Sequence, residues 1–136
     1  MYHFKLFKAF YNEKIEYLVV GGLAVNLHGV PRITYDIDII ISTAAENVLK
    51  INRTLIGLGY TPRLPVNPDE LADAQTLKNG MENRNLKDFS FFHQVHNHQI
   101  VDIVLDHPLD FPAAFQNRLR LKVDDFEISL VAIQDL

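Results

Sequence analysis

The stretch from Val19 to Ile41, VVGGLAVNLHGVPRITYDIDIII, constrains the fold most because it places two charges inside an apolar strand. Residues 34–41 alternate, so that Asp36 and Asp38 point to one side of a predicted strand and isoleucines point to the other. An ionised carboxylate that leaves water needs a partner or a proton. The stretch therefore predicts a strand with one buried face and one face on which two negative charges must be satisfied.

A pair of glycines precedes this strand. Gly21 and Gly22 follow the apolar segment from Tyr17 to Val20, and residues 23–28 are able to form a short helix. Glycine lets a phosphate approach the backbone closely, and the first turn of a helix offers free N–H groups. The order of strand, glycine turn and helix predicts a phosphate-binding position next to the two aspartates.

A third aspartate lies far along the chain within another apolar run. Asp102 stands in the second of two runs, residues 89–94 and 99–105, that predict a hairpin. Three carboxylates on neighbouring strands would repel one another, and a cation held by oxygen ligands removes that conflict. We therefore expect Mg²⁺, or Mn²⁺ in its place, bound by Asp36, Asp38 and Asp102. The alternative is that the strand ends at a polar loop and pairs with Arg32.

The composition favours one globular domain over residues 1–136. A chain of 136 residues with 48% hydrophobic residues can bury a core, and its net charge of −4 favours a small charged ligand over non-specific coating of nucleic acid. It has no cysteine, which excludes disulfides and thiolate chemistry and fits the cytoplasm, where we expect the protein. Lysines and glutamates interrupt the apolar N-terminal segment, so we expect no contact with a membrane.

The remaining segments predict further helices and strands. Thr43 and Glu46 form a predicted capping box at the start of one helix. Helices are predicted over residues 4–13, 43–58, 69–77 and 113–117, and a final strand pair over residues 119–123 and 126–130. The mixture of elements indicates an α+β (α/β) fold.

The ordered set of motifs resembles the nucleotidyltransferase superfamily that includes DNA polymerase beta and the minimal nucleotidyltransferases. Val20-Gly21-Gly22, Asp36-Ile37-Asp38-Ile39 and the distant Asp102 match that pattern. The longer stretch GGLAVNLHGVPRITYDIDI, followed by a helix ending in LGY, is more specifically similar to the bacterial abortive-infection (AbiEii-like) toxin nucleotidyltransferases. The resemblance implies the nucleotidyltransferase fold, a mixed central β-sheet flanked by helices.

The same resemblance implies an activity and a role for each residue of the motifs. A nucleoside monophosphate would pass from a nucleoside triphosphate, such as ATP, to a hydroxyl acceptor, and pyrophosphate would be released. Asp36 and Asp38 would bridge two Mg²⁺ ions, and Asp102 would bind the metal beside the acceptor and help to activate its hydroxyl. The expected nucleotide-binding residues are Gly21, Gly22, Arg32 and Thr34.

The resemblance also bears on partners and on catalytic competence. The acceptor would be RNA, a protein hydroxyl or a small molecule, and a toxin would have an antitoxin as its partner. Such toxins continue past a motif like Ser129 to Leu136 into a helix that bears a lysine, whereas this sequence ends at Leu136. We therefore expect a truncated or minimal domain, or one that lacks part of the usual site. The alternative function is a catalytically degenerate domain that binds a nucleotide or a partner.

Histidines offer a second, weaker metal hypothesis. His93, His96 and His98 lie around the predicted hairpin turn, where a zinc site is the alternative to solvated turn residues, which we favour. For His28, packing at the end of its short helix is favoured over a role as a base.

Overall fold

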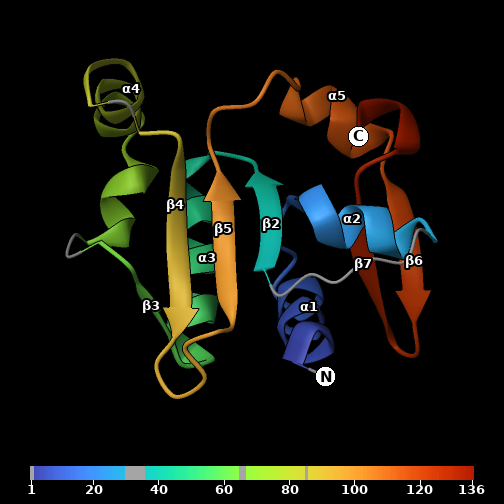
Figure 1. Ribbon diagram of the computed structural model, residues 1–136. Helices are drawn as coiled ribbons and strands as arrows, with labels where there is room; N and C mark the ends of the chain where they lie inside the picture. Colours follow the sequence, from blue (N-terminus) through green and yellow to red (C-terminus); the bar gives the residue numbers. More distant parts are fainter. Residues whose placement is uncertain (1, 30–35, 65–66, 85) are drawn as a thin grey trace.

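The computed structural model describes residues 2–29, 36–64, 67–84 and 86–136. Within these residues a mixed, seven-stranded sheet with the order β3-β4-β5-β2-β1-β7-β6 forms the centre of the molecule (Figure 1). Strands β2 and β5, and strands β1 and β7, pair in parallel, and all other neighbours are antiparallel. The strands are β1 (Tyr17–Val20), β2 (Asp36–Ile41), β3 (Tyr60–Pro62), β4 (Asp88–His93), β5 (Ile100–Val104), β6 (Leu119–Val123) and β7 (Phe126–Leu130).

Helices flank the sheet on both sides, which confirms the predicted fold class (Figure 1). In that view α3 lies behind β5 and β2, whereas α2 crosses in front of β7. The α-helices are α1 (Tyr2–Asn12), α2 (Gly21–Leu27), α3 (Ala45–Gly57), α4 (Ala74–Asn83) and α5 (Phe111–Gln116), and the 3-10 helices are η1 (Pro68–Ala72) and η2 (Ile133–Asp135).

The main core lies between the sheet and the layer of α1 and α3. Phe7 and Phe10 lie on one side of α1 and contact the ring of Tyr17 on β1. Ile51 of α3 and Ile39 of β2 are fully buried in the same cluster. Burying one such side chain contributes about 1.5–3 kcal/mol to folding. The isoleucines that alternate with Asp36 and Asp38 therefore anchor β2, so that the two aspartates point to the opposite face of the sheet, where both are partly exposed.

A smaller apolar cluster covers one end of the opposite face of the sheet. It joins the buried side chains of Leu18, Ile40 and Ala114, and the rings of Phe111 and Phe115 pack against it. Ile40 lies near the end of β2 and Asp36 at its start. Helix α5 therefore covers this face at the end away from Asp36, and the start of β2 is outside that cluster.

The start of α3 differs from the prediction. Ala44 is the N-cap and makes no side-chain capping bond, so the capping box of Thr43 and Glu46 is wrong. Asn47 ties this end of the helix down instead: its amide group donates to the carbonyls of Ser42 and Glu16 at 2.8 and 3.0 Å. The buried Asn47 therefore fixes the start of α3 through the carbonyl groups of Ser42 and Glu16, and not by capping the free N–H groups of the helix.

The segment after α3 also differs in part. The helix predicted over residues 69–77 is divided into η1 and α4, because Asp73 accepts hydrogen bonds from the backbone N–H groups of Gln75 and Thr76 and so starts a new helix. Strand β3, which the sequence did not indicate, pairs with β4. The last two strands have the predicted bounds.

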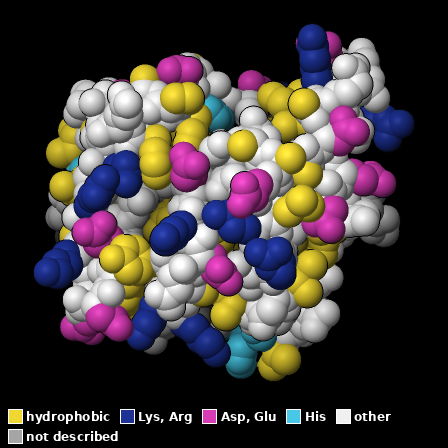
Figure 2. All heavy atoms as spheres, turned by 180° about the vertical axis from the view of Figure 1, so that it is seen from behind, with side chains coloured by type: hydrophobic (Ala, Val, Ile, Leu, Met, Phe, Trp, Pro, Cys, Tyr) yellow, Lys and Arg dark blue, Asp and Glu magenta, His cyan; other side chains and the backbone are white. Residues whose placement is uncertain are grey.

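The side of the molecule seen from behind is covered by charges of both signs. Figure 2 shows lysine and arginine side chains interspersed with aspartates and glutamates across this face. An ion pair joins Lys8 Nζ to Asp125 Oδ2 at 3.2 Å, and both side chains are largely exposed. Exposed pairs contribute little to stability.

In the part of the chain that the structure describes, every helix is too short or too polar to cross a membrane.

Candidate active site

The register of the sheet brings the three predicted aspartates together. Asp38 on β2 lies directly beside Asp102 on the parallel strand β5, and Val20 of β1 lies on its other side. Asp36 is two residues before Asp38 and shares its face of the sheet. Neighbouring strands are about 4.8 Å apart, so the carboxylates of one row meet at short range. The structure places these residues at one site, and their functional roles stay predictions.

Asp38 is the aspartate of this group whose pKa is clearly shifted. The pKa of Asp38 is raised to about 6, first because burial disfavours the charged carboxylate. The negative charges of Asp102 and Asp36, a hydrogen bond with Asp102 and the charge of Asp88 act in the same direction. The site therefore concentrates negative charge, and a bound cation would relieve it.

Two residues of the site were missed by the sequence reasoning. Ser90 of β4 lies beside Asp102, and its hydroxyl donates a hydrogen bond to Asp102 Oδ1. Asp88 is two residues earlier and points to the same face. The signal was present in the sequence, since Asp88 and Ser90 alternate with two phenylalanines as Asp36 and Asp38 alternate with isoleucines. A search for polar alternation in every apolar run would have found them.

Gly21 follows β1 directly and touches the same carboxylate. Its φ is +69°, in the region that favours glycine. A Cβ built on Gly21 would overlap Asp38 Oδ2 and would lie 3.2 Å from Asp38 Cγ. Only glycine fits this position without displacing Asp38. Gly22, the second residue of α2, is partly exposed, and the predicted residues Arg32 and Thr34 lie outside the described part of the chain.

The donor set suits a hard cation. In the described ranges, no group of three or more histidine, aspartate or glutamate side chains is arranged to hold a metal ion. The chemistry of Asp36, Asp38 and Asp102 still fits Mg²⁺, because all are carboxylates and negative neighbours raise the pKa of Asp38.

The arrangement of strands is similar to that of a solved structure. A crystal structure from Thermotoga maritima, of a protein provisionally assigned as a nucleotidyltransferase, matches this chain with a TM-score of 0.61 and 18% sequence identity. The match covers 98% of this chain and 76% of the other.

The chain has a nucleotidyltransferase-like fold. Neither a family model nor a curated protein sequence matches it. At 18% sequence identity, the likeness to the Thermotoga maritima protein establishes the fold alone. The aspartates, Ser90 and Gly21 are the residues that bear on the activity.

The histidine hypothesis is not supported at His93. Its Nδ1 accepts hydrogen bonds from the backbone N–H groups of Val95 and His96 at 3.1 and 3.0 Å. Its Nε2 lies 3.1 Å from the carbonyl oxygen of Leu58 and must carry the proton. Both nitrogens are thus engaged within the nucleotidyltransferase-like fold. His28 Nε2 lies 2.8 Å from the carbonyl oxygen of Val131, which agrees with a packing role for His28.

The raised pKa of Asp38 predicts a pH dependence of stability in metal-free buffer. An unfolded aspartate has a pKa of about 3.9, and the value for folded Asp38 is about 6. Between these values the folded state binds more protons, so the free energy of unfolding should fall as the pH rises from about 4 to about 6. Asp38→Asn should reduce this fall, and Mg²⁺ should restore stability to the unmutated protein above about pH 6. Urea denaturation across this range measures both effects, and an unchanged pH slope in Asp38→Asn would contradict the prediction.

Proposed function

We propose that this chain is a metal-dependent nucleotidyltransferase that moves a nucleoside monophosphate from a nucleoside triphosphate to a hydroxyl acceptor. The observation that carries the proposal is the position of Asp38, which contacts the Gly21 backbone on one side and lies beside Asp102 on the other. A phosphate-binding turn and an oxygen-ligand cluster that share one carboxylate suit a substrate that carries both phosphates and Mg²⁺.

Each residue of the site has a proposed task. Asp36 and Asp38 would hold Mg²⁺, or Mn²⁺ in its place, and Asp102 would complete the ligand set near the acceptor. The bound metal would neutralise phosphate charge and lower the pKa of the acceptor hydroxyl. Ser90 would keep Asp102 oriented, because its hydroxyl already occupies Asp102 Oδ1. Gly21 would leave room for a phosphate next to Asp38.

The proposed transfer needs no reactant other than the nucleoside triphosphate and the hydroxyl acceptor. The acceptor oxygen forms a bond to the α-phosphorus, and the bond from that phosphorus to the bridging oxygen breaks. The bridging oxygen keeps the electron pair, so pyrophosphate leaves. The proton of the acceptor hydroxyl passes to Asp102, which lies beside Asp38 in the sheet.

The finer assignment, a bacterial toxin of a toxin–antitoxin pair acting on RNA or on a protein, is also a proposal. It is supported by the resemblance of the stretch GGLAVNLHGVPRITYDIDI to abortive-infection toxins. An antitoxin would then be the protein partner.

The proposal is tested by label transfer. The purified chain is incubated with Mg²⁺, each nucleoside triphosphate labelled at the α-phosphate, and an extract of total RNA and protein. We expect label on one class of acceptor, and its loss in EDTA. Nucleotide binding without any transfer would overturn the catalytic proposal in favour of a binding domain, and no binding of any triphosphate would overturn both.

A further inference from the structure

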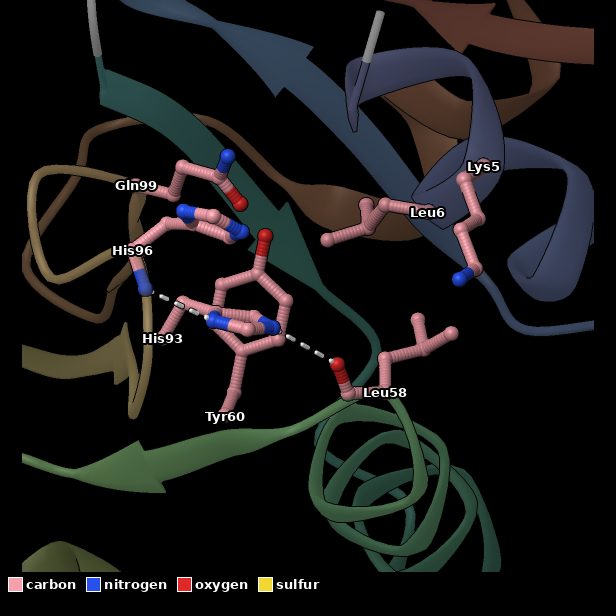
Figure 3. Close-up of a pocket in the computed structure, with 7 residues that line it drawn as sticks. All are labelled: Lys5, Leu6, Leu58, Tyr60, His93, His96 and Gln99. Carbon is pink, nitrogen blue, oxygen red and sulfur yellow. Dashed lines mark hydrogen bonds between the residues drawn. The ribbon is translucent and has the colours of Figure 1, made fainter.

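A cavity lies on the opposite face of the sheet from the aspartates. Ile100 pairs with Asp36 and shares its face, so the adjacent residue Gln99 points to the other side. The cavity has a volume of about 360 Å³. Figure 3 shows the side chains that surround it, from α1, the end of α3, β3 and the β4–β5 hairpin: Lys5, Leu6, Leu58, Tyr60, His93, His96 and Gln99.

Hydrogen bonds and close packing against Gly59 hold the His93 ring in one wall of the cavity. The three bonds of the His93 ring fix it to Leu58 and to the hairpin turn, and its ring packs edge-on against Tyr60 with centroids 5.2 Å apart. Gly59 has a φ of +95°, and a Cβ there would approach His93 Nε2 to 2.8 Å. The backbone and the ring are thus fitted to each other, and the wall is preorganised.

Three polar side chains of the cavity, those of Lys5, His96 and Gln99, can each donate a hydrogen bond. Lys5 Nζ lies across the cavity from the side chains of His96 and Gln99 (Figure 3). None of these three side chains makes a hydrogen bond or an ion pair with another described residue. Among the described residues that line the cavity there is no aspartate or glutamate, although the chain has 17 acidic residues. An ammonium, an imidazole and an amide without carboxylates nearby are suited to an anion.

The cavity also has an apolar part and more room than a bare anion needs. The buried Leu6 and Tyr60 and the partly exposed Leu58 are among the residues that line it. At about 30 Å³ for each molecule of liquid water, the volume of about 360 Å³ corresponds to about twelve waters. The lining therefore fits a ligand with an anionic end next to Lys5 and a small apolar end.

We propose that this cavity binds a small organic phosphate monoester. Such a ligand places its phosphate among the donors of Lys5, His96 and Gln99 and its organic part against Leu6 and Tyr60. The site is separate from the aspartate cluster, since the sheet lies between them. It therefore does not depend on the proposed transfer reaction.

The test uses phenyl phosphate as the probe in EDTA, so that no metal occupies the aspartate site. Amide chemical shifts are followed by NMR during titration of the whole chain, with inorganic phosphate as a second titrant. We expect saturable shifts at Leu58, His96 and Gln99, and weaker binding of inorganic phosphate because it lacks the apolar part. Shifts that centre on Gly21 and Asp38, or binding of inorganic phosphate as tight as that of phenyl phosphate, would overturn the proposal.

The Kd values of matched variants show which side chains contribute to binding of phenyl phosphate. Lys5→Met should raise the Kd about tenfold, the usual effect of one charge-assisted hydrogen bond. Lys8→Met, one turn further along α1 and paired with Asp125 outside the cavity, should leave the Kd unchanged. Gln99→Met is a second variant and should also weaken binding. An unchanged Kd in both Lys5→Met and Gln99→Met would overturn the proposal, as would equal losses in Lys5→Met and Lys8→Met.

Discussion

Replacing Asp36 and Asp38 together by asparagine is expected to lower nucleotidyl transfer by about 10³-fold or more. Asparagine keeps the shape of aspartate and removes the charge that would hold Mg²⁺. Loss of a metal's contribution is worth several kcal/mol, and each 1.36 kcal/mol is a factor of ten in rate. Transfer of label from the α-phosphate measures the loss.

The single variant Asp38→Asn should not be less stable than the unmutated chain in EDTA. The negative charges of Asp102 and Asp36 disfavour the charged form of Asp38 and contribute to its raised pKa. The control is Asp124→Asn in the exposed β6–β7 turn, where φ is +49° and asparagine is well tolerated. Full activity should remain in this control. Activity of the double variant close to that of the control would show that the aspartates are not the metal ligands.

Gly21→Ala is expected to lower the free energy of unfolding by about 2 kcal/mol or more and to weaken triphosphate binding. A left-handed conformation costs a non-glycine residue about 1–2 kcal/mol. The new methyl group would also overlap Asp38 Oδ2, so that the carboxylate has to move. Chemical denaturation and calorimetric titration with a triphosphate measure the two effects.

Gly29→Ala is the matched control for this substitution. Gly29 has a φ of +99°, yet a Cβ there would have no neighbour within 4 Å. It should therefore show the conformational cost alone and leave triphosphate binding unchanged. Equal losses of stability in the two variants, with triphosphate binding intact in both, would contradict this prediction. The close approach of Gly21 to Asp38 would then contribute neither to the free energy of unfolding nor to triphosphate binding.

Local pattern predicted most of the elements around the site. The alternation over residues 34–41 predicted strand β2, and the glycine pair predicted a short helix after β1, although α2 begins at Gly21 and so includes both glycines. The β6–β7 hairpin was also predicted with its bounds, because its alternation and its turn lie within a dozen residues. The helix predicted over residues 43–58 is present as α3, but its capping box was wrong, and the helix predicted over residues 69–77 is divided at Asp73. At both places the contacts of buried or capping side chains decide where a helix begins.

The sequence by itself determined that two carboxylates share one face of a buried strand, because side chains in a strand alternate with a period of two. It also determined that a pair of glycines lies before them, directly after another apolar strand. Only the tertiary structure decided which groups lie beside Asp38: Asp102, the Ser90 hydroxyl next to Asp102, and the Gly21 backbone. The physical reason is that strand order and register are set by the packing of residues far apart in the chain, and no local pattern carries that information.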